Sequence, residues 1–246
     1  MKYILPAIVI IVFSSAVWYF SNTSKMDTAQ KQNQVAQKDQ YAQPIVYEVD
    51  QADFVDAELL TADIQTGELS DTEAEGLVYM REEEKLARDV YQTLYEKWGA
   101  KVFVNITQSE QTHMDAVLTL LNRYGLTDPA SAQAGVFQNV DLQTLYTDLV
   151  AQGSASLIEA YNVGALIEDL DINDLELYMS GTIREDLLVV YENLQRGSRN
   201  HLRAFNSQIE QMTGTSYVPV YISETAFIEI IGNDTERGPK GGRGRN

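Results

Sequence analysis

The sequence contains no cysteine and only two histidines, His113 and His201. The lack of cysteine excludes disulfide bonds, thiolate metal sites and haem attached through cysteine. It also fits an exported protein that does not rely on disulfides. Any bound metal ion must therefore use oxygen and nitrogen ligands, and every imidazole ligand must come from one of these two positions.

Basic residues are also scarce, since 18 lysines and arginines stand against 36 aspartates and glutamates and leave a formal net charge of −18. A chain with this excess repels the phosphates of DNA and RNA, so we expect no nucleic-acid partner. The acidity has two explanations that composition does not separate. It keeps an exposed protein soluble, or it concentrates metal cations near the surface.

Long apolar runs are missing except in residues 1–20, where 18 uncharged residues follow Lys2. Such a run is typical of a cleaved secretory signal or of a membrane anchor, because about 20 apolar residues span a bilayer. We favour the uncleaved anchor. Both interpretations predict an extracytoplasmic protein, tethered to the membrane in the first case and secreted if the segment is cleaved.

Composition divides the chain into segments of different character. In order, we expect a signal peptide or membrane anchor (1–20), a disordered polar tether (21–45), an irregular N-terminal extension (46–69), a helical domain (70–214), a C-terminal extension (215–236) and a basic glycine-rich tail (237–246). The tether is rich in glutamine and cannot bury enough apolar surface to fold alone. The helical domain is long enough for one sizeable core.

The first half of the helical domain carries clear helix boundaries. Ser70 and Glu73 form a capping-box pattern that predicts the start of a long helix, and Trp98-Gly99 predicts its end. The periodicity predicts a second helix over Phe103–Tyr124, ended by Gly125. Because the connection between them is very short, we expect these two helices to run antiparallel.

The second half begins with a crossover, residues 126–153, in which Asp141–Gln152 has a helical apolar stripe. Ser154 is the expected cap of a third long helix, and Thr182 is the expected N-cap of a fourth that ends near Gly214. This order predicts an all-α fold. The architecture we expect is an antiparallel four-helix bundle with a helix-containing crossover.

Polar side chains interrupt the apolar stripe of each long helix. With 3.6 residues per turn, Glu110 and His113 share a face with Phe103, Val117 and Leu120. A buried, unpaired carboxylate is costly, so these groups need a partner, and a metal ion is one candidate. The polar groups on the inward faces are, helix by helix, Glu84; Glu110 and His113; Glu168 and Asp171; and His201.

The charged run Arg81–Lys85 is divided by helical geometry. Glu84 lies in line with the apolar Met80 and therefore faces inward. We expect Glu82 to face solvent and Glu83 to lie at the flank, in a solvated or helix-pairing role. Glu84 is thus the one member of this run that we expect in a site.

Each histidine taken singly is more often a hydrogen-bonded core residue than a metal ligand. Taken together, His113 and His201 both lie on inward stripes, and four helices in a bundle share one interior. Di-iron and di-manganese carboxylate proteins bring Glu-x-x-His from two helices and Glu from the other two to such an interior. The combined pattern therefore favours a metal site.

Two stretches carry a resemblance to known proteins. Glu84-x-x-Ala87-Arg88-x-x-Tyr91 resembles the first-helix signature of the ferritin-like superfamily, with rubrerythrin-type details, and Glu110-x-x-His113 resembles the second. More closely, EEEKLARDVY, SEQTHMDAV, GALIE and GSRNHLRAF resemble the ferritin-like family catalogued as domain of unknown function 2202, over residues 69–214.

The resemblance implies a ferritin-like bundle that holds two iron ions, with manganese or zinc as alternatives. The ligands it implies are Glu84, Glu110, His113, Glu168 and His201, with Glu110 or Glu168 bridging the two ions. Tyr91 is then either an ordinary core residue or the hydrogen-bond donor to a ligand carboxylate. The implied activity is that of an oxidoreductase toward peroxide or dioxygen, or of a ferroxidase.

One position departs from the ferritin-like pattern. Ser198 stands where a glutamate is expected, three residues before His201. A neutral hydroxyl is a poor metal ligand, so the second ion loses an anionic oxygen. Asp171, one turn after Glu168, either replaces that oxygen or is an ordinary buried acid. The departure keeps open an alternative, a non-catalytic metal-binding or protein-interaction module tethered to the cell surface.

The remaining predictions concern partners. We expect contact with the membrane through the N-terminal segment and a small oxidant as the reactant. A homodimer is compatible with the sequence, which does not reveal the oligomeric state. No catalytic residue is assigned.

Overall fold

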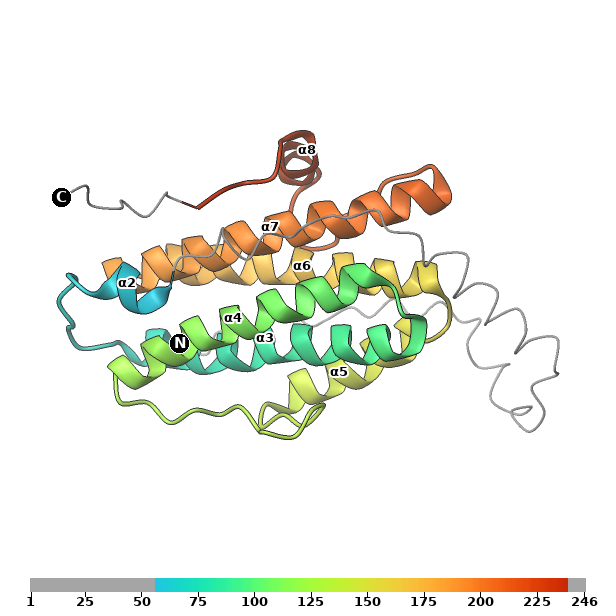
Figure 1. Cartoon of the computed structure of the whole chain (residues 1–246). Coiled ribbons are helices and arrows are strands. Elements are labelled where there is room, and N and C mark those ends of the chain that lie inside the picture. The colour runs from blue at the N-terminus through green and yellow to red at the C-terminus, as the bar shows by residue number, and fades with distance from the viewer. Residues whose placement is uncertain (1–55, 239–246) are drawn as a thin grey trace, which may run out of the picture. The chain divides into compact units, whose positions relative to one another are not determined.

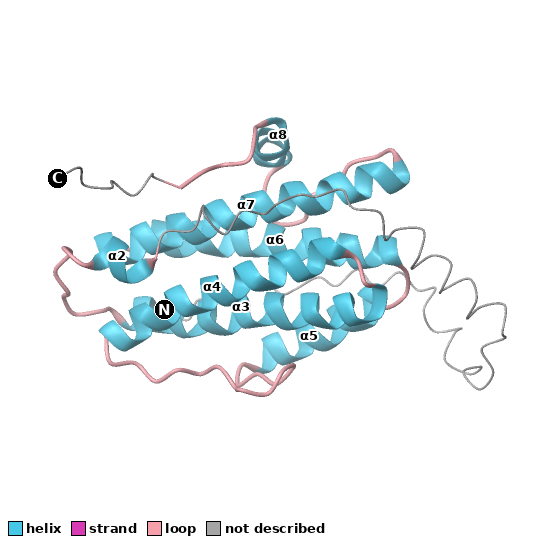
Figure 2. Ribbon diagram, in the orientation of Figure 1, coloured by secondary structure: helices cyan, strands magenta, loops and turns pink. Residues whose placement is uncertain are grey.

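The computed structural model describes residues 56–238. Within this range the protein is all-α, with seven helices and no strand (Figures 1 and 2). The helices are α2 (Ala57–Thr61), α3 (Asp71–Trp98), α4 (Lys101–Arg123), α5 (Val140–Gly153), α6 (Leu157–Ser180), α7 (Glu185–Thr213) and α8 (Glu224–Gly232). None of these helices combines the length and apolarity needed to cross a membrane. The predicted anchor and polar tether lie outside the described residues.

Helix α3 begins and ends where the sequence predicts. The Ser70 hydroxyl accepts a hydrogen bond from the Glu73 amide, and the Glu73 carboxylate accepts one from the Ser70 amide, so the capping box is formed. Gly99 adopts φ +68° after the last turn, a conformation that glycine takes without steric cost. The short connection through Gly99 and Ala100 places α4 beside α3 (Figure 1).

Two predicted caps are wrong by two residues each. Ser156 caps α6 by accepting from the Glu159 amide, whereas Ser154 follows the last turn of α5 in helical conformation. Arg184 occupies the N-cap position of α7. The Thr182 hydroxyl accepts a hydrogen bond from the Arg184 amide, in the turn that precedes the helix. Serine and threonine also stabilise the turns that precede helices, so the sequence alone does not separate a cap from such a turn.

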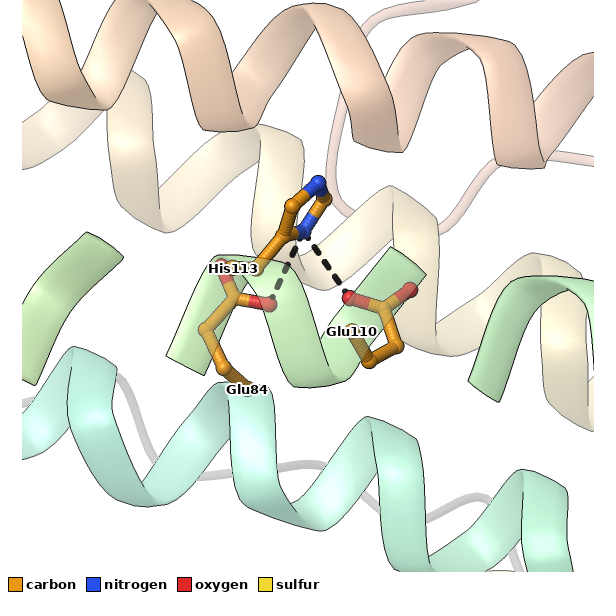
Figure 3. Close-up of side chains that lie close together, drawn as sticks. All are labelled: Glu84, Glu110 and His113. Carbon is orange, nitrogen blue, oxygen red and sulfur yellow. Dashed lines mark hydrogen bonds and ion pairs between the residues drawn. The ribbon is translucent and has the colours of Figure 1, made fainter. Parts of the chain in front are cut away.

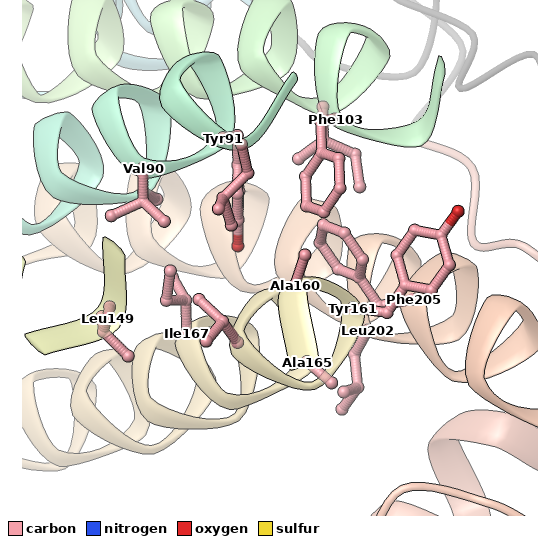
Figure 4. Packing of buried hydrophobic residues seen from close by; sticks show 14 of the residues in the cluster. Val90, Tyr91, Phe103, Leu149, Ala160, Tyr161, Ala165, Ile167, Leu202 and Phe205 are labelled. Atoms are coloured by element: carbon pink, nitrogen blue, oxygen red, sulfur yellow. The ribbon is translucent and has the colours of Figure 1, made fainter. Parts of the chain in front are cut away.

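The long helices α3, α4, α6 and α7 lie side by side and contribute to two apolar clusters. In the first cluster, Tyr91, Phe103, Tyr161 and Phe205 pack ring against ring (Figure 4). Gly164 makes this packing possible, because a Cβ there would lie 2.5 Å from the Phe205 ring.

The C-terminal extension is held by one buried acid of α6. Asp169 is fully buried and accepts hydrogen bonds from the Tyr217 hydroxyl and from the amides of Val220, Tyr221 and Ile222. Four donors satisfy both of its carboxylate oxygens, so its burial is fully compensated. The chain after α7 is thereby fastened along α6 before α8 begins.

Candidate metal centre

The predicted polar residues form a layer between the two apolar clusters. Along α3, the second cluster contains Met80, the first begins at Leu86, and Glu84 lies between them. Along α4 the order reverses, because Ile106 belongs to the first cluster and Ala116 to the second. On α7, too, polar residues lie between the part of the helix in the second cluster and the part in the first, and on α6 they lie close to the change from the first cluster to the second. The layer is listed helix by helix as Glu84; Glu110 and His113; Glu168 and Asp171; Ser198 and His201.

The first group of the layer joins α3 and α4. His113 Nδ1 lies 2.9 Å from Glu110 Oε2 and 3.2 Å from Glu84 Oε2 (Figure 3). Glu110 and His113 are one helical turn apart on α4, which is why both reach the same point. All three side chains are almost completely buried.

The second group joins α4, α6 and α7. His201 Nδ1 lies 2.9 Å from Glu110 Oε1 and 3.4 Å from Glu168 Oε2. The two oxygens of Glu110 therefore face two different imidazoles, whose rings stack with centroids 5.4 Å apart. Within each group, potential ligand atoms lie within 4.8 Å of one another, and Glu110 belongs to both groups.

Hydrogen bonds around the layer orient its members. The Tyr91 hydroxyl donates to Glu168 Oε1 at 2.5 Å, and Ser109 Oγ lies 3.0 Å from His201 Nε2. Both contacts use the side of the group that faces away from the carboxylate–imidazole pair. Such partners fix a ligand's rotamer and, for an imidazole, its tautomer. The hydrogen-bonding role suggested for Tyr91 is thus present in the structure.

Ser198 and Asp171 are directly connected. The Ser198 hydroxyl donates to Asp171 Oδ2 and also lies 3.1 Å from the Leu194 carbonyl oxygen. Asp171 Oδ1 is buried and has no hydrogen-bond partner among the described residues. Ser198, which stands on α7 where the ferritin-like pattern has glutamate, therefore hydrogen-bonds to a carboxylate of α6.

The expectation that Glu82 faces solvent is wrong, and so is the solvated alternative for Glu83, because each residue is only 2% exposed. Glu82 accepts hydrogen bonds from the amides of Gln138 at 2.7 Å and Asn139 at 2.8 Å, just before α5. The crossover covers the face of α3 that the helical stripe left to solvent. A stripe shows which face is apolar, but it does not show what covers the polar face.

Two further residues of the site were not predicted. Ser109 lies beside the imidazole of His201, as described above, and Gly197 lies beside that of His113. A Cβ on Gly197 would lie 2.5 Å from His113 Nε2, so only glycine leaves room for the ring. A glycine in the middle of a long helix is a sequence signal for such close approach.

Burial and neighbouring charges shift the pKa values of the layer. Burial raises the pKa of Glu84 to about 8, although the His113 imidazole opposes this effect. Burial also opposes ionisation of Glu110, but His201 and His113 outweigh it and hold the Glu110 pKa below its ordinary value. Burial disfavours charged His201, yet Glu110 and Glu168 raise its pKa to about 9. Without cations, protons therefore remain in the layer.

The composition of the layer suits divalent metal ions. Four buried carboxylates and two imidazoles offer mixed oxygen and nitrogen ligands, which are listed as Glu84, Glu110, Glu168, Asp171, His113 and His201. In the described part of the chain, the ion pairs that lysines and arginines form use acids outside the layer, such as Lys85 with Asp89 and Arg123 with Asp186. Some buried oxygens, such as Glu84 Oε1, have no hydrogen-bond donor, and a bound cation would compensate their burial.

The fold and the site together define an all-α protein with two buried carboxylate–histidine groups that could each hold a metal ion. The chain belongs to the family described as "Uncharacterized protein domain (DUF2202)", whose model matches residues 73–234. This is the family that the sequence motifs predict.

A curated relative and a solved structure agree with this assignment. The "Uncharacterized protein MJ0754" of Methanocaldococcus jannaschii is 53% identical over 171 residues, which cover 69% of this chain and 92% of the relative. The crystal structure of hypothetical protein MJ0754 from Methanococcus jannaschii matches with a TM-score of 0.69 at 51% identity, covering 71% of this chain and 99% of that one. Neither name states an activity.

Proposed function

We propose that this chain is a ferritin-like protein whose long helices hold a two-metal carboxylate centre, with iron as the expected metal and manganese or zinc as alternatives. The observation that carries the proposal is the position of Glu110. Its Oε2 lies 2.9 Å from His113 Nδ1, and its Oε1 lies 2.9 Å from His201 Nδ1. A carboxylate with one oxygen directed to each imidazole has the geometry of a bridge between two ions.

The ligands are assigned by the two groups. Glu84 and His113 would hold one ion, Glu168 and His201 the other, and Glu110 both. Asp171 is the fourth carboxylate of the centre and takes the place of the glutamate missing at Ser198. Two iron or manganese ions would supply redox chemistry toward dioxygen, peroxide or Fe(II).

The chain's own residues prepare the site for this chemistry. Tyr91 holds Glu168, and Ser109 holds His201, so the ligand atoms are directed inward before any ion arrives. Apolar clusters above and below the layer exclude bulk water. Low solvent access strengthens each charge interaction within the layer.

The cellular setting belongs to the same proposal. The apolar segment at residues 1–20 would tether the domain at the outer face of the membrane, or release it if cleaved. A small oxidant is the reactant we propose, and two copies of the chain could associate as a homodimer.

Anaerobic metal titration tests the centre. Metal-free full-length protein is expected to bind two equivalents of Fe(II) or Mn(II), measured by metal analysis after removal of free ions. Glu110→Gln removes the shared anion and should weaken both sites by about 10- to 100-fold or more. Asp115→Asn is the matched control, because Asp115 lies exposed on the same helix. Less than half an equivalent bound to the unaltered chain would contradict the proposal.

A non-catalytic metal-binding module is the second candidate, and Ser198 favours it. A hydroxyl at this position leaves the centre with one anionic oxygen fewer on α7 than the ferritin-like pattern provides. The two candidates differ in oxidant consumption by the iron-loaded protein. Consumption no faster than that of the same amount of free iron would select the non-catalytic module.

A further inference from the structure

The chain that follows α8 is attached to the outer face of α7 through Glu236 (Figure 1). Residues 233–235 before it and Arg237 after it are exposed, whereas Glu236 is half-buried between them. Both its side chain and its backbone bind residues of α7. One acidic residue in a non-helical segment is therefore recognised by a helix surface.

Two arginines of α7 bind the Glu236 carboxylate. Arg199 Nε donates to Oε1 at 2.8 Å and Arg199 Nη2 donates to Oε2, so one guanidinium group contacts both oxygens. Arg203 Nη2 donates to Oε1 at 2.7 Å. Bidentate pairing of this kind adds geometric specificity for a planar oxyanion to the attraction of opposite charges.

Asn200 binds the backbone of the same acidic residue. Its Oδ1 accepts from the Glu236 amide at 2.9 Å, and its Nδ2 donates to the Glu236 carbonyl oxygen at 3.0 Å. One side-chain amide thus satisfies both backbone groups of one residue, as an adjoining strand does when a peptide adds to a sheet edge. A free anion has no such backbone groups, so these contacts select a peptide.

Contacts that do not involve Glu236 hold the three binding side chains, which we call the acid clamp (Arg199, Asn200 and Arg203). Gln195 Oε1 accepts from Arg199 Nη1 at 2.8 Å, and the Ile230 carbonyl oxygen accepts from Arg203 Nε at 2.6 Å. Arg203 Nη1 also donates to Asn200 Oδ1 at 2.7 Å. The acid clamp is therefore preorganised, which lowers the entropy lost on binding.

The bound residue, in contrast, can leave at modest cost. The Glu236 side chain is 30% exposed, and the residues before it are exposed as well. Water competes for ion pairs at this exposure, so each of them contributes little to stability. A short segment held in this way opens more readily than the packed core does. The structure thus combines a fixed site with a releasable occupant.

We propose that the acid clamp is a binding site for an extended, glutamate-containing segment of a partner protein, and that Glu236 occupies it until such a segment displaces it. The partner's glutamate would make the same contacts, with its carboxylate on the two arginines and its backbone on Asn200. A short tether gives Glu236 an effective concentration on the order of millimolar, so the clamp is best measured after this competitor is removed. The site does not depend on the proposed metal centre.

A synthetic peptide with the sequence of residues 232–238 and blocked ends tests the acid clamp. It is added to full-length protein carrying Glu236→Ala, and binding is followed by saturation-transfer nuclear magnetic resonance of the peptide. We expect saturable binding that is about tenfold weaker in the unaltered chain, where Glu236 competes. The same peptide with glutamine in place of its glutamate should also bind about tenfold more weakly, because it loses the charge-assisted hydrogen bonds.

A second substitution separates charge from geometry. Arg199→Lys, added to the Glu236→Ala chain, keeps the positive charge but cannot contact both carboxylate oxygens, so peptide binding should fall about tenfold. Arg196→Lys is the matched control on the same helix, because Arg196 donates to Asn193 and not to Glu236. Circular dichroism checks that the helices persist in every variant.

Two results would overturn the inference. If the peptide fails to bind the Glu236→Ala chain, or binds the Arg199→Lys chain equally well, Glu236 only fastens the C-terminal segment to α7. If inorganic phosphate at the concentration of the peptide displaces it, the acid clamp binds oxyanions without selecting a peptide. Retention of the peptide in phosphate supports the contribution of Asn200.

Discussion

Glu110 differs from the other buried acids because both of its oxygens face an imidazole. Each oxygen lies 2.9 Å from one histidine nitrogen, whereas Glu84 and Glu168 each face one histidine. The two imidazoles hold its pKa low although burial opposes ionisation. It is therefore the acid of the layer whose negative charge the metal-free protein retains most strongly.

Gly197 decides where the His113 ring can lie. Gly197→Ala would place a Cβ 2.5 Å from His113 Nε2, so the ring must leave its present position beside Glu84 and Glu110. We expect a loss of about 1–3 kcal/mol in the free energy of unfolding, measured by urea denaturation, together with weaker metal binding. Gly181→Ala is the control, because its nearest atoms lie at 3.6 Å. Equal behaviour of the two variants would show that the ring adapts freely.

At the scale of elements, α3 contacts protein on nearly every side over Met80–Ala87. Its inner face carries Glu84, and the opposite face carries Glu82, which binds the chain before α5. Neighbouring acids of one charged run thus have different roles: Glu84 belongs to the candidate metal site, and Glu82 holds the crossover.

Glu82→Gln tests the anchoring of the crossover. In Glu82 one oxygen accepts from the Gln138 amide and the other accepts from the Asn139 amide. The substitution replaces one of these oxygens by an NH₂ group, which cannot accept, so one of the two hydrogen bonds is lost. We expect a loss of about 1–3 kcal/mol in the free energy of unfolding and faster hydrogen exchange at these two amides. Glu75→Gln, at an exposed position of the same helix, should leave both quantities unchanged.

At the scale of the whole molecule, the acidic layer makes the stability of the metal-free protein depend on pH. The pKa of His201 is raised to about 9 and that of Glu84 to about 8, so the folded protein binds more protons than the unfolded chain. The stabilisation from His201 is complete below its unfolded pKa of about 6.5 and is lost as pH rises through 9. That from Glu84 is lost as pH rises from its unfolded pKa through 8.

Urea unfolding of the metal-free protein between pH 6.5 and 9 measures this effect. We expect the free energy of unfolding to fall by a few kcal/mol over this range, because each shifted pKa unit contributes about 1.4 kcal/mol. Added Mn²⁺ should restore more stability at pH 9 than at pH 6.5, since metal ions then replace the lost protons. Glu84→Gln should flatten the dependence, and a slope of opposite sign would refute the assignment of protons to the layer.

Helical periodicity identified the inward acids because it reports the angle of a side chain around its own helix. Glu84, Glu110, Glu168 and both histidines follow directly from that angle. Periodicity could not place Glu82 and Glu83, since their burial depends on the crossover and on α6, which are distant in sequence. Ser109 was missed because a serine on a helix has many ordinary roles.

The sequence by itself determined the helical class, the long helices, the family and the residue types of the polar layer, because these follow from local periodicity, capping and motif spacing. Only the tertiary structure decided which oxygen faces which imidazole. It showed that Glu110 is shared and that Ser198 supports Asp171. Each of these contacts joins different helices, and their relative rotation and height arise from packing of the whole core.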